Sequence, residues 1–461
     1  MEIFQSIIQY ILNLGAAIFV PLIIFIIGLF IRMPIKKAFL SALTLGIAFT
    51  GMNMLVAFMS NSVTPAGKAL AGNTGVSLPA LDLGGTATNG IVWAWSLAYT
   101  FFAVEIIVNI VLLSFKLTKT LNVDMWNIAT VALSAFVVYY VTGNLLYGYL
   151  TGIVQTILQL KIGDMFQKRV QELTGIPLLT VTHFMLISVV LMNPINKLLD
   201  KLPFLNKKLD ADALKEKLGF FSEQSVMGFI IGLLLGFAGA WSVSKSLNLA
   251  IEVATALALF PIIAKFFMDA LSPLADTMSE FMKKKYKNKE VFIGVDWPVL
   301  AGCSEVWVTV IILIPIFILL AVIMPGNEVL PLAGIINMPL AVGGLLLTGG
   351  NLLRMLILGI IFTPLYLYGS TWLAPILTGL AKQTGAFHVA KGQLITSSTV
   401  EGPEFKFFFA EAFKGNLLGI LGTVIFIVMF YWVYKDVTKK NKDIDFSHHA
   451  KKLNKKEQIQ I

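Results

Sequence analysis

Long apolar runs separated by short polar segments make up most of this chain of 461 residues. Over windows of about 19 residues, many runs approach or exceed the ~20 residues that a helix needs to cross a bilayer. The pattern therefore predicts an all-α polytopic membrane protein with about eleven transmembrane segments. These segments lie near residues 8–31, 38–59, 92–114, 127–160, 176–199, 225–243, 248–272, 299–324, 329–348, 351–378 and 412–434.

Three of the segments contain residues that interrupt helices. The run 127–160 is too long for one span, and Thr142-Gly143-Asn144 predicts a break into two elements. Segments 176–199 and 329–348 both contain Asn and Pro, so each could be a full span or a re-entrant hairpin. Irregular backbone at membrane depth is tolerated only where protein or a water-filled cavity satisfies it. These interruptions therefore predict the interior of the protein.

Composition narrows the class of protein further. Hydrophobic residues make up 57% of the chain and charged residues 13%, against roughly 45–50% and 25% in soluble domains. A soluble enzyme, a disordered protein and a secreted disulfide scaffold are excluded, and the long runs are unlike the alternating strands of an outer-membrane barrel. The single cysteine, Cys303, argues against a disulfide or a cysteine metal cluster. No GxxxxGK[ST] motif occurs, so we expect no bound cofactor and no ATP-driven transport.

The net charge of +9 is concentrated between and after the apolar runs. Basic residues gather in 31–37, 197–224, 279–298 and 435–461, which is the pattern of the positive-inside rule with anionic lipid as the counter-charge. It argues against nucleic-acid binding. We expect the N-terminus outside as part of the first span, a polar loop over 60–91 outside, and the C-terminus in the cytoplasm. The domain prediction is one transmembrane domain over 1–434 and a basic cytoplasmic tail over 435–461.

Two pairs of similar stretches suggest an internal repeat. FIIGL occurs at 25–29 and again at 229–233, and Asn61–Pro65 resembles Asp269–Pro273 at nearly the same offset. The repeats would span approximately 8–199 and 225–378 and enter the membrane from opposite sides. Inverted repeats are typical of carriers that bind substrate at the repeat interface near the membrane midplane. On the residues alone, a carrier is therefore favoured over a channel.

Polar residues beside the interrupted segments are the candidates for binding. Asp124 lies two residues before Trp126 and Asp296 directly before Trp297, an arrangement that suits the hydroxyls and carbon chain of a polyol, although helix N-capping explains an Asp equally well. Asn127 follows the first of these motifs. His183 lies in an apolar segment, and Glu401 lies in a polar stretch before the last span. The alternatives are a structural histidine and a plain surface loop.

At several of these residues the chain resembles the IIC membrane component of the galactitol-type phosphoenolpyruvate-dependent sugar phosphotransferase system. The resemblance extends over nearly the whole chain. Its strongest motifs are NVDMWNI (122–128), KIGD (161–164), KLGFFSEQSVMGFIIGL (217–233), MDALSPLAD (268–276), FIGVDWPVLAG (292–302), PGNEVLPLAGI (325–335) and GNLLR (350–354).

The resemblance implies a permease subunit of the bacterial inner membrane and not an enzyme in its own right. By similarity to ascorbate-type permeases, it implies a homodimer with a rigid dimerisation region and a mobile, elevator-like core. A sugar or polyol would bind from outside and be phosphorylated on the cytoplasmic side by a separate phosphocysteine protein, IIB, supplied by IIA. We expect Asp124, Asn127, His183, Asp296 and Glu401 to line the sugar site.

Two departures from the galactitol pattern bear on the substrate. The family carries Pro-His-Gly in the region where this chain reads LLTVTH (178–183), with its histidine either shifted or absent, and Gly-His where this chain has Gly302-Cys303. A related polyol, pentose or hexose is therefore as well supported as galactitol. The alternative function is an ion-coupled carrier for a sugar or polyol, with Glu105 and Glu305 as proton sites. A sensor that binds IIB without transporting a sugar is a third hypothesis.

Overall fold

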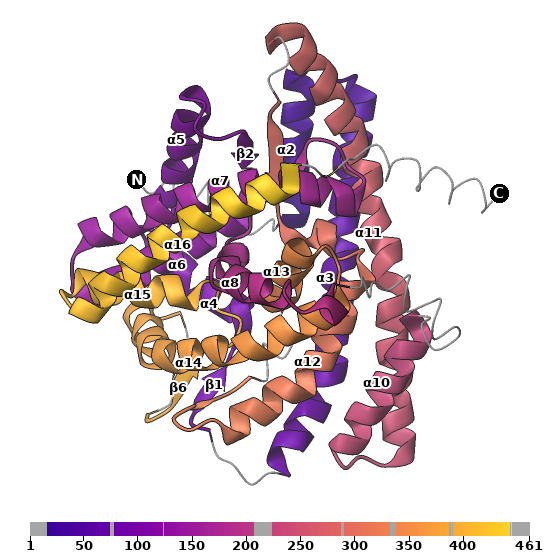
Figure 1. The fold of residues 1–461 in the computed structure, drawn as a ribbon, viewed down its shortest axis with the longest axis vertical. Coiled ribbons are helices and arrows are strands. Elements are labelled where there is room, and N and C mark those ends of the chain that lie inside the picture. Colours follow the sequence, from indigo (N-terminus) through magenta and orange to yellow (C-terminus); the bar gives the residue numbers. More distant parts are fainter. Residues whose placement is uncertain are drawn as a thin grey trace.

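The computed structural model describes residues 16–73, 78–122, 124–206, 224–286, 290–331, 338–386, 389, 391–442 and 444. Most of these residues are helical, and two small sheets lie among the helices (Figure 1). The helical class is therefore confirmed, but the hydropathy pattern did not predict the sheets.

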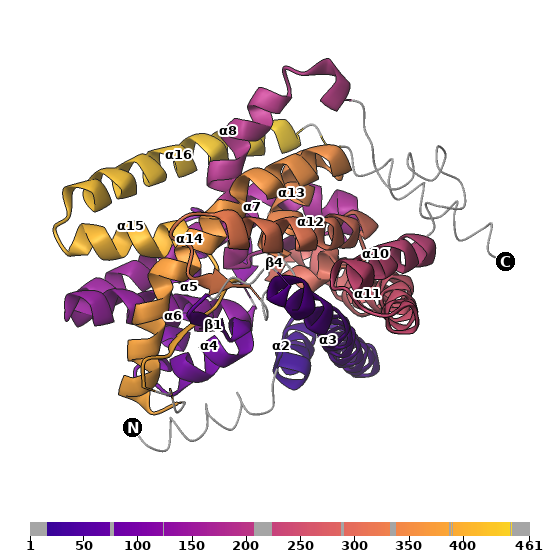
Figure 2. The same cartoon turned by 90° about the horizontal axis from the view of Figure 1, so that it is seen from below.

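Four helices form two long hairpins on one side of the molecule (Figure 2). We call them the four-helix unit: α2 (Ala16–Phe30), α3 (Ile35–Gly72), α10 (Gln224–Ala238) and α11 (Val243–Tyr286). Within the second hairpin, Gly228, Gly232 and Gly236 recur every fourth residue of α10 and lie against small residues of α11. A Cβ on Gly232 would come within 2.7 Å of the Cα of Ala250. The absence of side chains here lets the two backbones approach closely.

The remaining helices surround the sheets. They are α4 (Gly84–Trp93), α5 (Thr100–Ser114), α6 (Met125–Thr142), α7 (Leu145–Thr174), α8 (Val189–Leu199), α12 (Ser304–Ile323), α13 (Met338–Thr348), α14 (Leu352–Thr384), α15 (Pro403–Phe413) and α16 (Leu417–Lys442). Short 3₁₀ turns are η1 (Phe184–Ser188), η2 (Pro203–Leu205) and η4 (Trp297–Leu300). Among the described residues, three helices, α12, α14 and α16, are long and apolar enough to cross a membrane by length and composition.

Each sheet has three parallel strands and combines both halves of the chain. Sheet A has the order β5-β1-β6, and sheet B has the order β2-β4-β3. The central strand of each sheet comes from one half, and both flanking strands come from the other half. The strands are β1 (Ala80–Asp82), β2 (Thr120–Asn122), β3 (Leu179–Val181), β4 (Phe292–Val295), β5 (Val329–Leu330) and β6 (Leu394–Thr396).

The predicted break at 142–144 is confirmed. Helix α6 ends at Thr142, Gly143 has a φ of +69°, and the Asn144 side chain caps α7 by accepting a hydrogen bond from Leu146 N. Segment 176–199 is not one continuous helix, because β3 and η1 precede α8. In segment 329–348, residues 332–337 lie outside the described part, and β5 and α13 form its two ends.

One predicted boundary is wrong. The loop expected over 60–91 begins too early, because α3 continues through Pro65 to Gly72 and α4 forms from Gly84. Polar residues lower the hydropathy average without ending the helix, and Val63 and Ala66 are still fully buried there. Helix α16 extends to Lys442, eight residues past the predicted end of the membrane domain at 434. That domain boundary stays a prediction, because a helix can continue beyond the membrane. Residues 445–461 of the predicted tail lie outside the described part.

Candidate functional site

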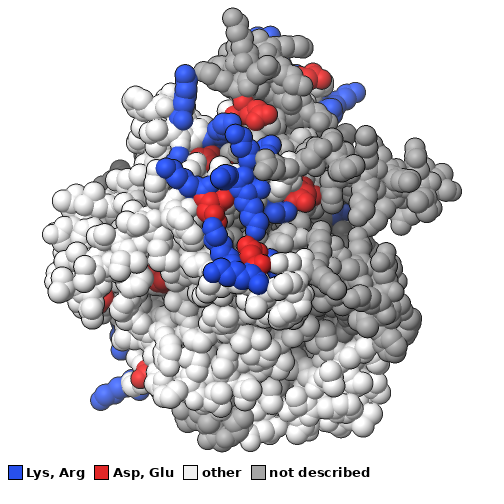
Figure 3. All heavy atoms as spheres, viewed as in Figure 1, with Lys and Arg blue, Asp and Glu red and all other residues white. Residues whose placement is uncertain are grey.

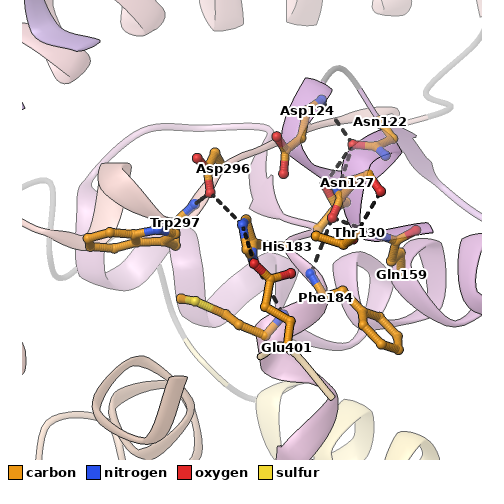
Figure 4. Close-up of polar contacts among 12 residues, drawn as sticks. Asn122, Asp124, Asn127, Thr130, Gln159, His183, Phe184, Asp296, Trp297 and Glu401 are labelled. Carbon is orange, nitrogen blue, oxygen red and sulfur yellow. Dashed lines mark hydrogen bonds and ion pairs between the residues drawn. The ribbon is translucent and has the colours of Figure 1, made fainter. Parts of the chain in front are cut away.

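The carboxyl end of sheet B carries a cluster of ionisable side chains (Figure 4). His183 lies two residues after β3, and Asp296 follows directly after β4. The Nε2 atom of His183 is 3.4 Å from Asp296 Oδ1 and 3.6 Å from Glu401 Oε1. The carboxylates of two predicted site residues therefore lie beside the imidazole of a third, although the three come from segments far apart in the sequence.

The hydrogen bonds of His183 define which nitrogen carries the proton. Its Nδ1 atom accepts a hydrogen bond of 3.3 Å from the backbone N–H of Met185. In the neutral ring, an accepting Nδ1 leaves the proton on Nε2. We infer this tautomer from the hydrogen bond, and it directs an N–H group toward the carboxylates of Asp296 and Glu401.

Asp124 completes the cluster from the end of β2. Ligand atoms of Asp124, His183 and Asp296 all lie within 4.8 Å of one another, and the three residues are buried. This spacing could hold a cation, and it equally suits the closely spaced hydroxyls of a sugar. Trp297 is adjacent to Asp296, as the motif suggested, whereas the side chain of Trp126 lies outside the described part.

Asp296 is both a helix N-cap and a member of the cluster. Its Oδ1 atom accepts a 2.6 Å hydrogen bond from the backbone N–H of Trp297 and caps η4. The cap fixes the carboxylate at the start of the turn while the same side chain faces His183. A local role and a role in the site are therefore compatible for this residue.

Asn127 lies behind the cluster, where its amide bonds to other protein groups. Its Oδ1 accepts from Gln159 Nε2 at 2.7 Å and from the backbone N–H of Phe184 at 3.2 Å. Its Nδ2 donates to Thr182 Oγ1 at 3.1 Å. These bonds connect α6 to α7 and to the turn that carries His183. In this structure Asn127 therefore holds the turn that presents the histidine.

Several polar residues of this network were not among the predicted site residues. Asn122 Oδ1 accepts from Thr182 Oγ1 at 2.7 Å, and Asn122 Nδ2 donates to Glu105 Oε2 at 3.2 Å. Asn109 donates to the carbonyl of Thr120 at 2.8 Å, so polar residues of α5 hold the strand that leads to Asp124. The available signals were the positions of Asn122, two residues before Asp124, and of Thr182, directly before His183, whereas Gln159 gave none.

The stretch before α15 is a buried part of the protein and not the surface loop considered as an alternative. Ser397 and Ser398 are 1% exposed. Lys406, on the first turns of α15, is fully buried, and its Nζ atom donates to the backbone carbonyl of Glu401. Sequence reasoning missed this lysine, although a charged residue within an apolar segment is usually paired or functional.

The arrangement is suited to recognising hydroxyl groups. The carboxylates of Asp124, Asp296 and Glu401 can each accept hydrogen bonds, and the His183 ring supplies a donor among them. Burial strengthens such bonds and raises the cost of leaving any of these groups unsatisfied. A ligand rich in hydroxyl groups would therefore satisfy the cluster well.

We expect Asn127→Ala to weaken both stability and binding. Removal of the amide leaves Gln159 Nε2 and the Phe184 N–H without this acceptor, and an unsatisfied buried group costs about 1–3 kcal/mol. Thermal unfolding of the purified protein should show a lower midpoint than the wild type. The exposed Asn61→Ala on α3 is the matched control, and an unchanged midpoint for Asn127→Ala would contradict the positioning role.

The chain is similar to known sugar permease components. The family described as the PTS system sugar-specific permease component (EIIC-GAT) matches residues 10–391. A putative permease IIC component of Escherichia coli (strain K12) is 31% identical over 428 residues, which cover 92% of this chain and 98% of that protein. The PTS system galactitol-specific EIIC component of the same organism is 30% identical over 417 residues, covering 89% and 91%. The chain therefore belongs to the EIIC-GAT family of sugar-specific permease components of the phosphotransferase system.

Proposed function

We propose that this chain carries a polyol or sugar across the bacterial cytoplasmic membrane. On the cytoplasmic side, a separate IIB protein, which receives its phosphoryl group from IIA, would phosphorylate the sugar. Membership of a permease family and the apolar helices agree with a membrane transporter. The observation that carries the proposal is the meeting of His183 with Asp296 and Glu401 at the end of sheet B. Asp124, Asp296 and Glu401 would accept hydrogen bonds from sugar hydroxyls. Asn127 would hold the turn that carries His183.

The topology of the sheets supports two inverted repeats, the second of which would have to extend past its predicted end at 378 to include β6. If β1, β2 and β3 correspond to β4, β5 and β6, the order β5-β1-β6 becomes β2-β4-β3 on exchange of the halves. FIIGL then lies in α2 and α10, the first helices of the two long hairpins. The turns after β3 and β6 also correspond, and they carry His183 and Glu401. A substrate between these turns would occupy the repeat interface, where carriers of this architecture hold it.

This division suggests which parts of the protein move. We assign the four-helix unit to the dimerisation region of a homodimer and the remainder to an elevator-like core that moves with the sugar. The unit consists of two extended hairpins that contact each other. The core contains both sheets and all four clustered side chains. About eleven membrane segments, with the N-terminus outside, remain our proposal for the topology.

One basic surface supports the orientation of the C-terminal end. Lys168, Lys201, Lys435, Lys439 and Lys440 are exposed at the ends of α7, α8 and α16. Lys168 donates to the carbonyl of Lys442 at 3.1 Å, and Lys440 is 3.7 Å from Asp200, so these ends lie together. Figure 3 shows Lys and Arg side chains gathered on this face. We assign it to the cytoplasm, beside anionic lipid headgroups and accessible to IIB.

The test uses membrane vesicles that contain the protein and a panel of radiolabelled polyols, pentoses and hexoses. Each compound is offered with and without the cognate IIA, IIB and phosphoenolpyruvate. We expect one compound to accumulate in phosphorylated form only when all partners are present. Accumulation of the unmodified compound that collapses with a protonophore would identify an ion-coupled carrier instead. Binding of IIB without accumulation of any compound would point to a sensor.

A further inference from the structure

A second buried carboxylate, at the end of sheet A, is hydrogen-bonded to the segment that carries Glu401. Asp82 is the last residue of β1, the central strand of that sheet, and is 5% exposed. Its Oδ1 atom accepts from the backbone N–H groups of Gly84 and Ser398, at 3.1 and 3.0 Å. Its Oδ2 atom accepts from Ser398 Oγ at 2.5 Å. Asp82 thus fixes both the backbone and the side chain of Ser398.

The arrangement corresponds to that in the other sheet. Asp296 follows the central strand of sheet B and lies near His183, two residues after β3. Asp82 ends the central strand of sheet A and bonds Ser398, two residues after β6. In sheet B the partner is the imidazole that lies in the cluster. In sheet A the partner is a serine three residues before Glu401. Any effect of Asp82 on the cluster would therefore pass through the backbone between Ser398 and Glu401.

The segment between Ser398 and α15 is held along its length. Ser370 Oγ donates to the carbonyl of Ser397 at 3.0 Å, and Lys406 donates to the carbonyl of Glu401. Gly402 has a φ of +57°, and a Cβ there would come within 2.6 Å of the Phe184 ring. Because these contacts leave the backbone little freedom, the direction of the Glu401 side chain depends on where Ser398 is anchored.

We propose that Asp82 is a positioning residue for sugar binding, which anchors Ser398 so that Glu401 reaches the cluster around His183. The inference rests on the proposed sugar site but concerns a residue outside it. Replacement of Asp82 by Asn exchanges an acceptor for an N–H₂ group where three donors converge. The Ser398 hydroxyl can still accept from this N–H₂ group, but the loss of the negative charge turns three charge-assisted hydrogen bonds into weaker neutral ones.

The first test needs no sugar. Amide hydrogen exchange of the full-length protein in detergent is compared between wild type and Asp82→Asn. We expect faster exchange in peptides covering 397–402, with unchanged exchange in peptides covering α10, residues 224–238. Equal exchange of 397–402 in both proteins would overturn the proposal. Ser398→Ala, which keeps the Gly84 bond, should give a smaller change of the same kind and serves if Asp82→Asn does not fold.

The second test separates positioning from general destabilisation. Binding of the sugar identified by the uptake panel is measured without IIB for Asp82→Asn, Glu401→Gln and the double variant. We expect each single change to raise Kd by about tenfold, as for the loss of one hydrogen bond to a charged group. The double variant should be no weaker than Glu401→Gln, because Asp82 acts through Glu401. If the increases in Kd of the two single variants multiply in the double variant, Asp82 acts independently of Glu401, and the proposal is overturned.

These readouts also distinguish failure of the inference from failure of the proposed function. Sugar binding without IIB-dependent phosphorylation would contradict the transport proposal and leave the hydrogen-exchange result standing. Normal transport, with unchanged exchange and Kd in Asp82→Asn, would contradict the positioning role alone.

Discussion

The variant Asp296→Asn is expected to reach the membrane at wild-type levels and to lose sugar uptake. The asparagine oxygen can still accept the hydrogen bond from Trp297 N that caps η4, so the local fold should persist. The charge that faces His183 at 3.4 Å is lost, together with one of the acceptors available to a hydroxyl-rich ligand. With two charged hydrogen bonds affected at about 1.5–3 kcal/mol each, apparent affinity should fall roughly a hundredfold or more.

The measurement is IIB-dependent accumulation in vesicles, alongside the amount of protein and its elution in size-exclusion chromatography. Asp269→Asn is the matched control, because Asp269 is an exposed aspartate on α11, outside the cluster. The control should transport normally. Normal uptake by Asp296→Asn would remove Asp296 from the sugar site, and loss of the protein from the membrane would assign it a folding role instead.

The variant Gly232→Leu is expected to produce the largest loss of stability. Its Cβ would meet the Cα of Ala250 at 2.7 Å and the carbonyl oxygen of Leu249 at 2.8 Å. Backbone atoms cannot turn aside as a flexible side chain can, so α10 would be forced away from α11. Overpacking typically costs about 1–3 kcal/mol, occasionally more, and we expect the upper end of this range.

Thermal unfolding of the detergent-solubilised protein provides the measurement, with retention in size-exclusion chromatography as a second readout. Gly85→Leu is the control, since a Cβ at this helical glycine meets nothing within 4 Å. A midpoint equal to that of the control would show that the close contact between α10 and α11 does not contribute to stability.

Local signals in the sequence predicted much of the helical framework. Apolar runs near the length of a span correspond to helices such as α12, α14 and α16, because hydropathy reports directly on burial in protein or lipid. The break at Gly143 was predictable for a similar reason, since glycine in the left-handed region followed by an N-capping Asn ends one helix and starts another. Where the signal was only polarity, as over 60–72, it placed the helix end too early.

The sheets could not be read from the sequence. Their strands are two to four residues long and join segments from both halves of the chain. Strands this short carry no usable alternation, and nothing local indicates that β4 pairs with β2 and β3. The hydrogen-bond network of Asn127, Thr182 and Gln159 was equally unpredictable, because its members become neighbours only when α6 and α7 pack against the turn after β3.

The sequence by itself determined the membrane class, the apolar segments, the family resemblance and the residue types suited to a sugar. The tertiary structure decided that Asp124, His183, Asp296 and Glu401 meet, while Asn127 lies behind them. The physical reason is the range over which each property acts. Hydropathy and helix breaks depend on neighbouring residues, whereas the cluster depends on parallel strands and turns that bring together positions up to 277 residues apart, from Asp124 to Glu401.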